Sequence, residues 1–595
     1  MIPFKAIVEK IVAIEQSFDV NSVTFKNIKI WPLIRLLLRQ QIGHPHADYL
    51  KKGKYETDKK IVKLQKEHFA QLSKYKDTEV LFFSRHEEHF EKLDNKHYNP
   101  FLDPMIEFTN RNYNTLKIEI PFYLDKIQEK LPRFTSTVFI IPSTITEKAT
   151  NRSIQNFSDL QRIVLDITGL FIDEAFFINE ARTINAWQFF FEQVLLAIKP
   201  KAVFFVYFHY HVAMALVSVC KKLSIVTADV QHGRHGSYNG AYTHWTQIPQ
   251  NGYELLPDYF WCWGRTCQNS IAKCYPGDIL NHRPVVGGNL WVSKWINDEE
   301  PDINEGSKNF YNLLAQKEKV ILLILQGPDT PLKEFVFEAM RMSPKGWLWL
   351  IRLHPRYSDN NRKKRIYDIF RKYCTNFEIE YATSCPLYGL LKRCDHHLTA
   401  NSSTFYEALA FNVPTTIIDP TGLDIYQKEY QLNLLTYSDS YELLLKLINE
   451  GYLKKIDSSE YIETSPKVAQ KTLLEIINHY SSNKINEKKM EFNAENNKRN
   501  ALELNQLGKD LYKRKFIRAA LNIFFKALEK SQDCAIIYNN IGILYCQNGE
   551  KNKSFIFFAK AMETAPDDMQ ISLNVIALLK NLANKNKRLD LLRLL

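Results

Sequence analysis

A run from Asp229 to Gly236 places a carboxylate and two imidazoles around a pair of glycines, directly after an apolar stretch. Histidine titrates near neutral pH and glycine lets a ligand approach the backbone, so His232 could act as a base toward a hydroxyl. Asp229 is the nearest carboxylate, and Gln231 and Gly233 complete the Gln-His-Gly motif. A simple turn with a structural histidine explains the same residues equally well.

A second reactive segment reads Arg-Leu-His-Pro-Arg, from Arg352 to Arg356, with His354 at its centre. An imidazole N–H between two guanidinium groups suits a phosphate or diphosphate leaving group, because negative charge grows on it as the bond breaks. A His-Pro dipeptide on its own indicates little.

The third segment is Asn401-Ser402-Ser403-Thr404, which leads into a predicted helix that contains Glu407. Hydroxyl groups and free N–H groups at the start of a helix can bind phosphate. Glu407, one turn further on, could accept hydrogen bonds from ribose. Ordinary N-capping and a capping box explain the same pattern.

Other strand ends offer weaker candidates. Gly327-Pro328 follows an apolar run and would place a loop against a donor phosphate, or form a plain turn. Glu87 and Glu88 follow another apolar run, and His209 and His211 a third. The sequence leaves open which of these groups, or Asp229, is the base or nucleophile, and therefore whether transfer inverts or retains configuration.

The elements that would position these residues form two series of apolar strands that alternate with helices. Parallel sheets bind ligands beyond the carboxyl ends of their strands, so two doubly wound α/β domains are expected. The residues before 75 are predicted to be helical, a helix is expected at 211–223, and the domain junction falls near 292–315. The predicted strands are 79–84, 116–122, 203–208, 224–230, 319–325, 347–353, 397–399 and 415–419.

The end of the chain has a different pattern. Residues 481–500 contain few apolar side chains, which predicts a linker or an exposed helix. Gly508 and Phe524 recur further along as Gly542 and Phe558, at a spacing that resembles the tetratricopeptide repeat. Residues 569–595 are expected to cap these repeats or, being basic and leucine-rich, to rest on an anionic membrane.

A length of 595 residues predicts several domains, and a hydrophobic fraction of 45% is enough to form their cores. Lys plus Arg number 78 against 66 Asp plus Glu, and the net charge of +12 favours an anionic partner without indicating nucleic acid. The chain starts without an apolar signal core, no apolar run is long enough to span a bilayer, and the nine cysteines form no CxxC pair. These features predict a cytoplasmic protein, with peripheral contact at the inner membrane face as the other option.

The order QHG, RLHP and NSST-x-x-EAL-x-x-x-VP resembles bacterial GT-B glycosyltransferases of surface polysaccharide synthesis. It is most similar to the capsule and lipopolysaccharide enzymes that transfer Kdo or sialic acid from CMP donors, and the resemblance covers roughly residues 200–430. The resemblance implies two Rossmann-type domains facing a cleft, here 1–295 and 296–480. A linker at 481–500 and an all-α tetratricopeptide-repeat domain at 501–595 would follow.

The resemblance also implies roles for individual residues. His354 would stabilise the departing phosphate, and His232, Asp229 or Glu88 would act on the acceptor side. No Asp-x-Asp metal signature lies at the candidate strand ends, so transfer without metal or cofactor is expected. The nucleotide and donor would be bound by Gln231, Gly233, Gly327, Arg352, Asn401, Ser402, Ser403, Thr404 and Glu407.

Two alternatives remain at this stage. Teichoic-acid polymerases share the QHG and His-Pro elements, so a CDP-polyol phosphotransferase is one. A noncatalytic scaffold is the other, because tetratricopeptide repeats mainly bind peptides. The acceptor could be a glycan, a lipid-linked glycan or a protein, and the repeats could recruit a protein partner.

Overall fold

The computed structural model describes residues 4–44, 58–85, 88, 91–93, 96–121, 133–148, 153–236, 239–273, 281–297, 305–326, 332–354, 360–451, 456–513, 515–531 and 534–583. Contacts divide the chain into two units, Met1–Tyr480 and Ser481–Leu595. Within the described residues, no helix is both long and apolar enough to cross a membrane.

The first unit contains a seven-stranded sheet in which every neighbouring pair is parallel. Its spatial order is β8-β7-β4-β10-β11-β12-β13, so the chain reverses direction across the sheet between β4 and β10. Such a switch point leaves a crevice beyond the carboxyl ends of the two strands, where ligands bind in open α/β sheets. The strands are β4 (Val80–Arg85), β7 (Thr115–Ile120), β8 (Thr137–Phe139), β10 (Ala202–Phe205), β11 (Val226–Val230), β12 (Tyr259–Cys262) and β13 (Arg283–Val286).

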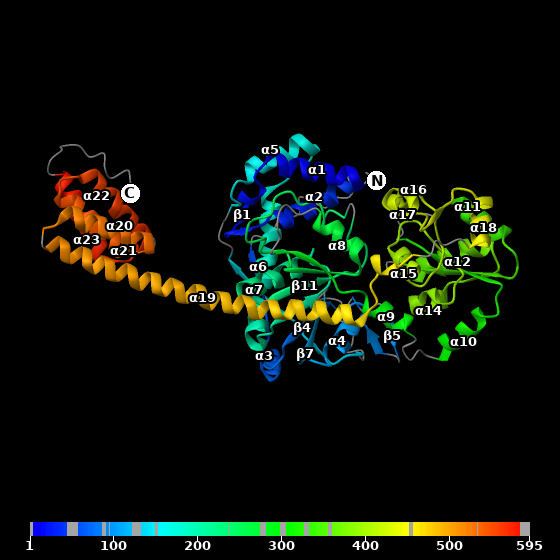
Figure 1. The fold of residues 1–595 in the computed structure, drawn as a ribbon. Helices are drawn as coiled ribbons and strands as arrows, with labels where there is room; N and C mark the ends of the chain where they lie inside the picture. The colour runs from blue at the N-terminus through cyan, green and yellow to red at the C-terminus, as the bar shows by residue number, and fades with distance from the viewer. Residues whose placement is uncertain are drawn as a thin grey trace. The chain divides into compact units, whose positions relative to one another are not determined.

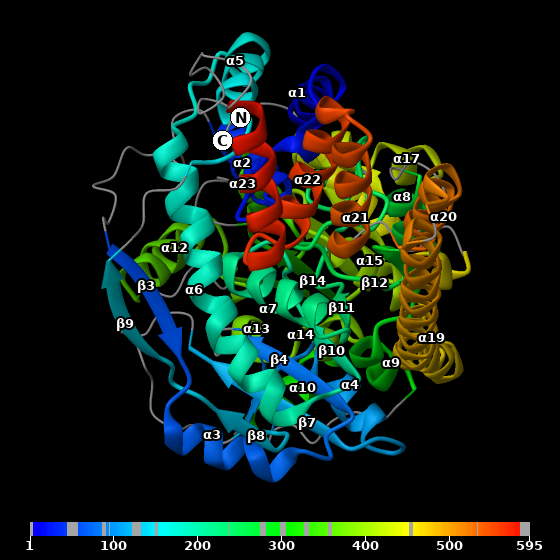
Figure 2. The same cartoon turned by 90° about the vertical axis from the view of Figure 1, so that its left-hand side faces the viewer.

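Both faces of this sheet are covered, as its continuous apolar strands require. Phe83 and Phe205 point into a core shared with α1 (Phe4–Ser17), α2 (Trp31–Gly43), α5 (Phe157–Thr168), α6 (Glu174–Ile198) and α7 (His211–Lys222). Figure 2 shows α6 and α7 in front of the central strands. Phe82 and Phe204 point to the opposite face, where α4 (Asp103–Thr109) and the first turns of α19 (Pro466–Lys513) pack.

A second sheet of six parallel strands follows, visible with its helices in Figure 1. Its order is β16-β15-β14-β17-β18-β19, which places the switch point between β14 and β17. The strands are β14 (Lys319–Ile324), β15 (Trp347–Arg352), β16 (Phe377–Glu378), β17 (His396–Thr399), β18 (Thr415–Ile417) and β19 (Thr436–Tyr437).

Helices also cover both faces of the second sheet. One face packs on α9 (Leu290–Ile296), α10 (Glu305–Leu314), α14 (Leu387–Leu391) and α15 (Thr404–Ala410). The other packs on α11 (Glu334–Met342), α12 (Asn360–Tyr373) and α18 (Tyr441–Glu450). The remaining elements are α3 (Lys66–Leu72), β5 (Glu91–Leu93), β6 (Lys96–Tyr98), α8 (Arg265–Ala272), α13 (Glu380–Ser384), α16 (Pro420–Ile425) and α17 (Gln427–Gln431).

The prediction of two Rossmann-like domains followed by a helical region is confirmed, and the predicted strands correspond to β4, β7, β10, β11, β14, β15, β17 and β18. The prediction that residues before 75 are helical is wrong in part. β1 (Thr24–Phe25) and β2 (Ile28–Lys29) form a hairpin whose turn residues Lys26 and Asn27 both have positive φ. β3 (Asp58–Lys63) pairs with the distant β9 (Ser143–Lys148), a partner that no local pattern reveals.

In the unit Ser481–Leu595, the described residues form helices joined by short connections. The unit contains the end of α19, whose backbone is helical throughout 481–500, together with α20 (Ile517–Lys530), α21 (Ala535–Gln547), α22 (Lys551–Thr564) and α23 (Met569–Ala583). A Cβ added at Gly508 would lie 2.6 Å from the Phe524 ring, and one at Gly542 would lie 2.7 Å from the Phe558 ring. The same close contact between helices therefore occurs twice within this unit, once in each sequence repeat.

Candidate functional site

The Gln-His-Gly loop leaves the carboxyl end of β11 and is held by Gln231. The Gln231 amide donates to the carbonyl oxygen of Gly233 at 2.7 Å and accepts from the backbone N–H of Trp263 at 2.6 Å. Its own N–H donates to the Trp261 carbonyl oxygen on the neighbouring strand. The Gln231 side chain therefore shapes the loop that presents His232 and Gly233.

This loop meets the Ser-Ser loop at the end of β17 in the second sheet. A Cβ added at Gly233 would lie 3.5 Å from the Ser403 hydroxyl oxygen. Two segments that are far apart in the sequence, each at the carboxyl end of a parallel strand, thus come together. Substrate groups bound at the two sheets could meet at this junction.

Asp229, on β11, is fully buried beside the first switch point. One carboxyl oxygen accepts a hydrogen bond from the Tyr242 hydroxyl at 3.0 Å, and the other has no partner among the described residues. The Tyr242 oxygen also lies 3.4 Å from His209 Nδ1. Burial raises the pKa of Asp229 well above its usual value and lowers that of His209 to about 3.

The two imidazoles of the loop also contact each other. His232 Nδ1 lies 3.2 Å from His235 Nε2, and the His235 ring stacks on Tyr242 with centroids 3.8 Å apart. Burial holds the pKa of both histidines well below the usual value, so both are neutral at pH 7. Only one proton can lie between the two facing nitrogens, so the tautomer of His232 is coupled to that of His235.

Tyr207 supports His232 from the end of β10. The two ring centroids are 3.6 Å apart, and Tyr207 has a φ of 64°. Such a conformation costs about 1–3 kcal/mol for a bulky residue and persists only where the surroundings enforce it. The Arg85 guanidinium lies 5.2 Å from the Tyr207 ring and donates to Glu88 at 2.8 Å. Glu88, a predicted catalytic carboxylate, is buried and engaged with Arg85.

In the second sheet, the Ser-Ser loop is ordered by hydrogen bonds of its own. The Ser402 N–H donates to Thr399 Oγ1, and the Ser402 hydroxyl accepts from the Thr404 N–H. The Tyr426 hydroxyl donates to the Ser402 carbonyl oxygen at 2.8 Å. Ser403 differs, because its hydroxyl has no hydrogen-bond partner among the described residues.

The remaining residues of this motif lie in and around α15. Asn401 contacts the Thr421 hydroxyl at 3.4 Å, and Thr404 Oγ1 lies 3.2 Å from His397 Nε2. Glu407 is buried, with one carboxyl oxygen 3.4 Å from the Tyr388 hydroxyl and the other without a partner among the described residues. Burial raises the pKa of Glu407 to about 8, so its carboxyl group is protonated at neutral pH.

The His-Pro segment is described only up to His354, which follows β15 and is partly exposed. Arg352 donates from Nη1 to the carbonyl oxygens of Ala382 and Cys385, so it braces a neighbouring segment. His211, at the start of α7, lies 2.7 Å from the Glu180 carboxylate. Two predicted site residues, Glu87 and Gly327, and also Arg356 lie outside the described residues.

Sequence reasoning missed Tyr242 and Tyr207 and gave His235 no role of its own, although these three residues link the predicted ones. The sequence does concentrate histidine and tyrosine at 207–211 and 232–244, but this pattern does not indicate which of these side chains contact each other.

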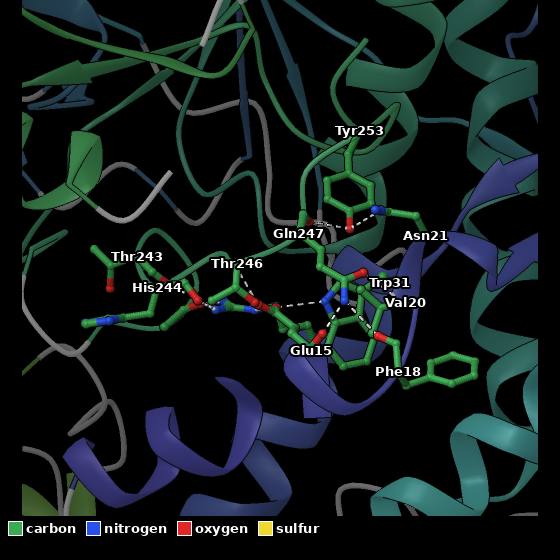
Figure 3. Close-up of polar contacts among 12 residues, drawn as sticks. Glu15, Phe18, Val20, Asn21, Trp31, Thr243, His244, Thr246, Gln247 and Tyr253 are labelled. Atoms are coloured by element: carbon green, nitrogen blue, oxygen red, sulfur yellow. Dashed lines mark hydrogen bonds and ion pairs between the residues drawn. The ribbon is translucent and has the colours of Figure 1, made fainter. Parts of the chain in front are cut away.

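The segment after Tyr242 is anchored to the N-terminal helices, as Figure 3 shows. Glu15 accepts from Trp31 and from both the N–H and the hydroxyl of Thr246, and Gln247 donates to the Phe18 carbonyl oxygen. Arg35 Nε lies 2.8 Å from the Glu15 carboxylate. Because these groups are buried, the network fixes α2 against the loop that carries Tyr242.

A cavity of about 750 Å³ lies elsewhere in the first unit, between α6, α7 and the β1–β2 hairpin. Lys26, Lys29, Glu192 and Lys222 contribute to its lining. None of the predicted site residues lines this cavity.

No protein-family model matches the chain. Comparison with curated proteins also gives no match. Solved structures similar to the chain include UDP-GlcNAc 2-epimerase from Methanocaldococcus jannaschii, with 15% identity, a TM-score of 0.40 and coverage of 66% of this chain and 99% of that one. UDP-GlcNAc 2-epimerase from Neisseria meningitidis bound to UDP-GlcNAc has 15% identity, a TM-score of 0.41 and coverage of 67% and 99%. Trehalose 6-phosphate synthase from Burkholderia multivorans has 8% identity, a TM-score of 0.39 and coverage of 69% and 98%.

Proposed function

We propose that the chain is a glycosyltransferase that moves a sugar from a nucleotide-activated donor to an acceptor hydroxyl. The observation that carries the proposal is the contact between Gly233 and Ser403, which joins the loops at the carboxyl ends of β11 and β17. Each loop lies at or next to the switch point of its sheet, where parallel sheets bind ligands.

In this proposal the second sheet binds the nucleotide. Ser403 has a free hydroxyl for a phosphate oxygen, and the protonated Glu407 can donate to a ribose or base oxygen. His354 stabilises the negative charge that develops on the leaving phosphate. These groups stabilise the leaving group without a metal ion, so transfer should continue in the presence of EDTA.

The first sheet acts on the acceptor. His232 is neutral, partly exposed and adjacent to Gly233, so it can accept the proton of the attacking hydroxyl. The tautomer of His232 is coupled to that of His235, and Tyr242, which donates to Asp229, stacks on the His235 ring. The acceptor is a surface glycan, a lipid-linked glycan or a glycosylated protein.

For the donor we propose a CMP-linked acidic sugar of the Kdo or sialic acid type, as used in capsule and lipopolysaccharide synthesis. The motif order QHG, RLHP and NSST supports this choice. For the C-terminal unit we propose tetratricopeptide repeats that bind a protein partner, because the glycine–phenylalanine contact recurs at the spacing of that repeat.

Calorimetric titration with CMP, CDP, UDP and GDP tests the proposal. The wild-type chain should bind CMP selectively, and Ser402→Ala/Ser403→Ala should weaken that binding about tenfold or more, by loss of hydrogen bonds to a charged group. Ser73→Ala, an exposed serine outside both loops, is the control and should leave the affinity unchanged.

Each other outcome points to a different class. Preference for CDP indicates a polyol-phosphate donor, and preference for UDP or GDP indicates an ordinary hexose donor. A folded protein that binds none of the four nucleotides would contradict the proposal and indicate a scaffold.

A further inference from the structure

The charges of two arginines, Arg39 and Arg234, act on each other, and no carboxylate in the described part of the chain forms an ion pair with either. Among the described residues, the buried Nε atom of Arg39, near the end of α2, and the buried Nη1 atom of Arg234, in the Gln-His-Gly loop, have no hydrogen-bond partner. Among the described residues neither guanidinium forms an ion pair. Arg35, one turn before Arg39, is by contrast fully engaged with Glu15 and backbone carbonyl groups.

Asn239 connects the Arg39 side chain to the backbone of Arg234. Its amide oxygen accepts from Arg39 Nη1 at 3.5 Å, and its amide nitrogen donates to the Arg234 carbonyl oxygen at 2.8 Å. Burial, together with the charges of Arg35 and Arg234, lowers the pKa of Arg39 to about 10, which still leaves it charged at pH 7. A buried N–H group without a hydrogen bond destabilises the protein, because it loses its water without gaining a new acceptor.

No described side chain removes this cost. Glu429 is the carboxyl group whose charge interacts with Arg234, but the two do not form an ion pair, and burial raises the pKa of Glu429 and favours its neutral form. The Phe4 ring lies 5.5 Å from the Arg234 guanidinium, but an aromatic ring binds a guanidinium group more weakly than an anion does. A bound anion would satisfy both arginines at once.

The pair also lies beside the candidate site. Arg234 directly follows Gly233. Its positive charge acts to lower the pKa of Tyr406 and Tyr426, which lie near the second sheet. The charge of Arg39 reaches His209. A ligand at the junction of the two loops would therefore place its acidic group within the field of both guanidinium groups.

We propose that Arg39 and Arg234 together bind the anionic oxygen group, carboxylate or phosphate, of the molecule that occupies the junction between the Gln-His-Gly and Ser-Ser loops. The planar N–H fork of arginine matches both groups. Only the identity of the molecule that carries the anionic group rests on the proposed function. The proposal adds two specificity-determining residues, one on α2 and one in the loop after β11, to a site whose ligand is otherwise expected to be bound by the second sheet.

The test is calorimetric titration at low ionic strength with three probes: inorganic phosphate, CMP and free N-acetylneuraminate. The variants are Arg39→Gln and Arg234→Gln, with Arg39→Lys and Arg234→Lys as charge-retaining versions. The matched control is Arg265→Gln, whose side chain is 70% exposed. Circular dichroism and the melting temperature establish that each variant is folded.

We expect the wild type to bind at least one probe and each Gln variant to weaken that binding about tenfold or more, with the Lys variants intermediate and Arg265→Gln unchanged. Loss with phosphate and CMP identifies a phosphate group, whereas loss with N-acetylneuraminate alone identifies a sugar carboxylate. Wild type that binds none of the three probes, or folded Gln variants with unchanged affinities, would overturn the inference.

Failure here is distinguishable from failure of the proposed function. If CMP binding depends on Ser402 and Ser403 but not on either arginine, the transferase proposal stands and the proposal that Arg39 and Arg234 bind an anion is wrong. If phosphate or N-acetylneuraminate binds in an arginine-dependent manner but the four nucleotides bind without selectivity, the arginines do bind an anion and the proposed CMP-linked donor is wrong.

Discussion

Burial, rather than ion pairing, controls the ionisable groups at the junction of the two loops. Asp229 and Glu407 each keep one carboxyl oxygen without a partner among the described residues, and burial raises the pKa of both. The histidines beside Asp229 shift in the opposite direction for the same reason. The site is therefore a set of neutral donors and acceptors at pH 7, with positive charge supplied by arginines at its edge.

Glu407 allows a test of this state. The folded protein keeps its proton up to about pH 8, whereas the unfolded chain releases it near pH 4.5. Between these values the folded state binds more protons, so the contribution of Glu407 to stability falls as pH rises through this window. We expect Glu407→Gln to abolish this part of the pH dependence, a difference of up to about 4 kcal/mol between pH 5 and pH 8.

Urea unfolding of both proteins at pH 5 and pH 8 measures the effect, because other titrating groups contribute equally to the two curves. Parallel pH dependences in wild type and Glu407→Gln would contradict the assignment of a protonated Glu407.

Tyr242 donates the hydrogen bond that Asp229 receives. Tyr242→Phe removes this hydrogen bond from a fully buried carboxyl group, which should lower the free energy of unfolding by about 1–3 kcal/mol. Urea unfolding at pH 7 is the measurement. Tyr430→Phe removes the hydroxyl of an exposed tyrosine and serves as the control, with an expected change of about 0.5 kcal/mol or less. Equal effects of the two substitutions would show that the Asp229 contact contributes nothing.

At the scale of elements, the helices of the C-terminal unit depend on glycines that let them approach closely. A Cβ at Gly542 on α21 would lie 2.7 Å from the ring of Phe558, a side chain on α22 that is 2% exposed and has no room to move. Alanine would gain about 1 kcal/mol of helix propensity, but overpacking costs about 1–3 kcal/mol, so the steric term should win.

We therefore expect Gly542→Ala to raise amide hydrogen exchange in α21 and α22 of the full chain. The double variant Gly542→Ala/Phe558→Leu reduces the clash and should restore part of the protection. Slower exchange in the single variant would mean that helix propensity outweighs the contact.

The sequence predicts most interior strands of both sheets because these are continuous apolar runs, such as Lys319–Ile324, but it misses β12 inside the first sheet. It does not reveal the edge strands. The Rossmann-like order could be expected from alternating strands and helices, whereas the contact between Gly233 and Ser403 could not, because the two residues belong to different sheets and lie far apart in the chain. For the site, the motif residues could be singled out, but Gln231 could not be recognised as a loop anchor nor Tyr242 as the partner of Asp229. Those roles depend on side-chain direction, which spacing does not specify.

At the scale of the whole molecule, α19 belongs to both units. Its first turns place Ala469, Leu473, Ile476 and Ile477 against the first sheet, although they follow the second sheet in the chain. Burial of Leu473, Ile476 and Ile477 contributes roughly 1.5–3 kcal/mol each, which together is comparable to the whole stability of a domain. The first sheet therefore requires residues beyond 465 to cover one of its faces.

Neighbouring leucines on α19 test this dependence in the full chain. Leu473 is 3% exposed and packs in the core of the first sheet, whereas Leu474 is 40% exposed on the same turn. Leu473→Ala should lower the free energy of unfolding by about 2–5 kcal/mol and speed hydrogen exchange in β4 and β10, while Leu474→Ala should cost about 1 kcal/mol or less. Both substitutions change helix propensity equally, so the difference between them measures the packing of α19 on the sheet. If the two variants unfold at the same urea concentration, the first turns of α19 do not stabilise the sheet, and a chain ended at residue 465 should be as stable as one ended at 480.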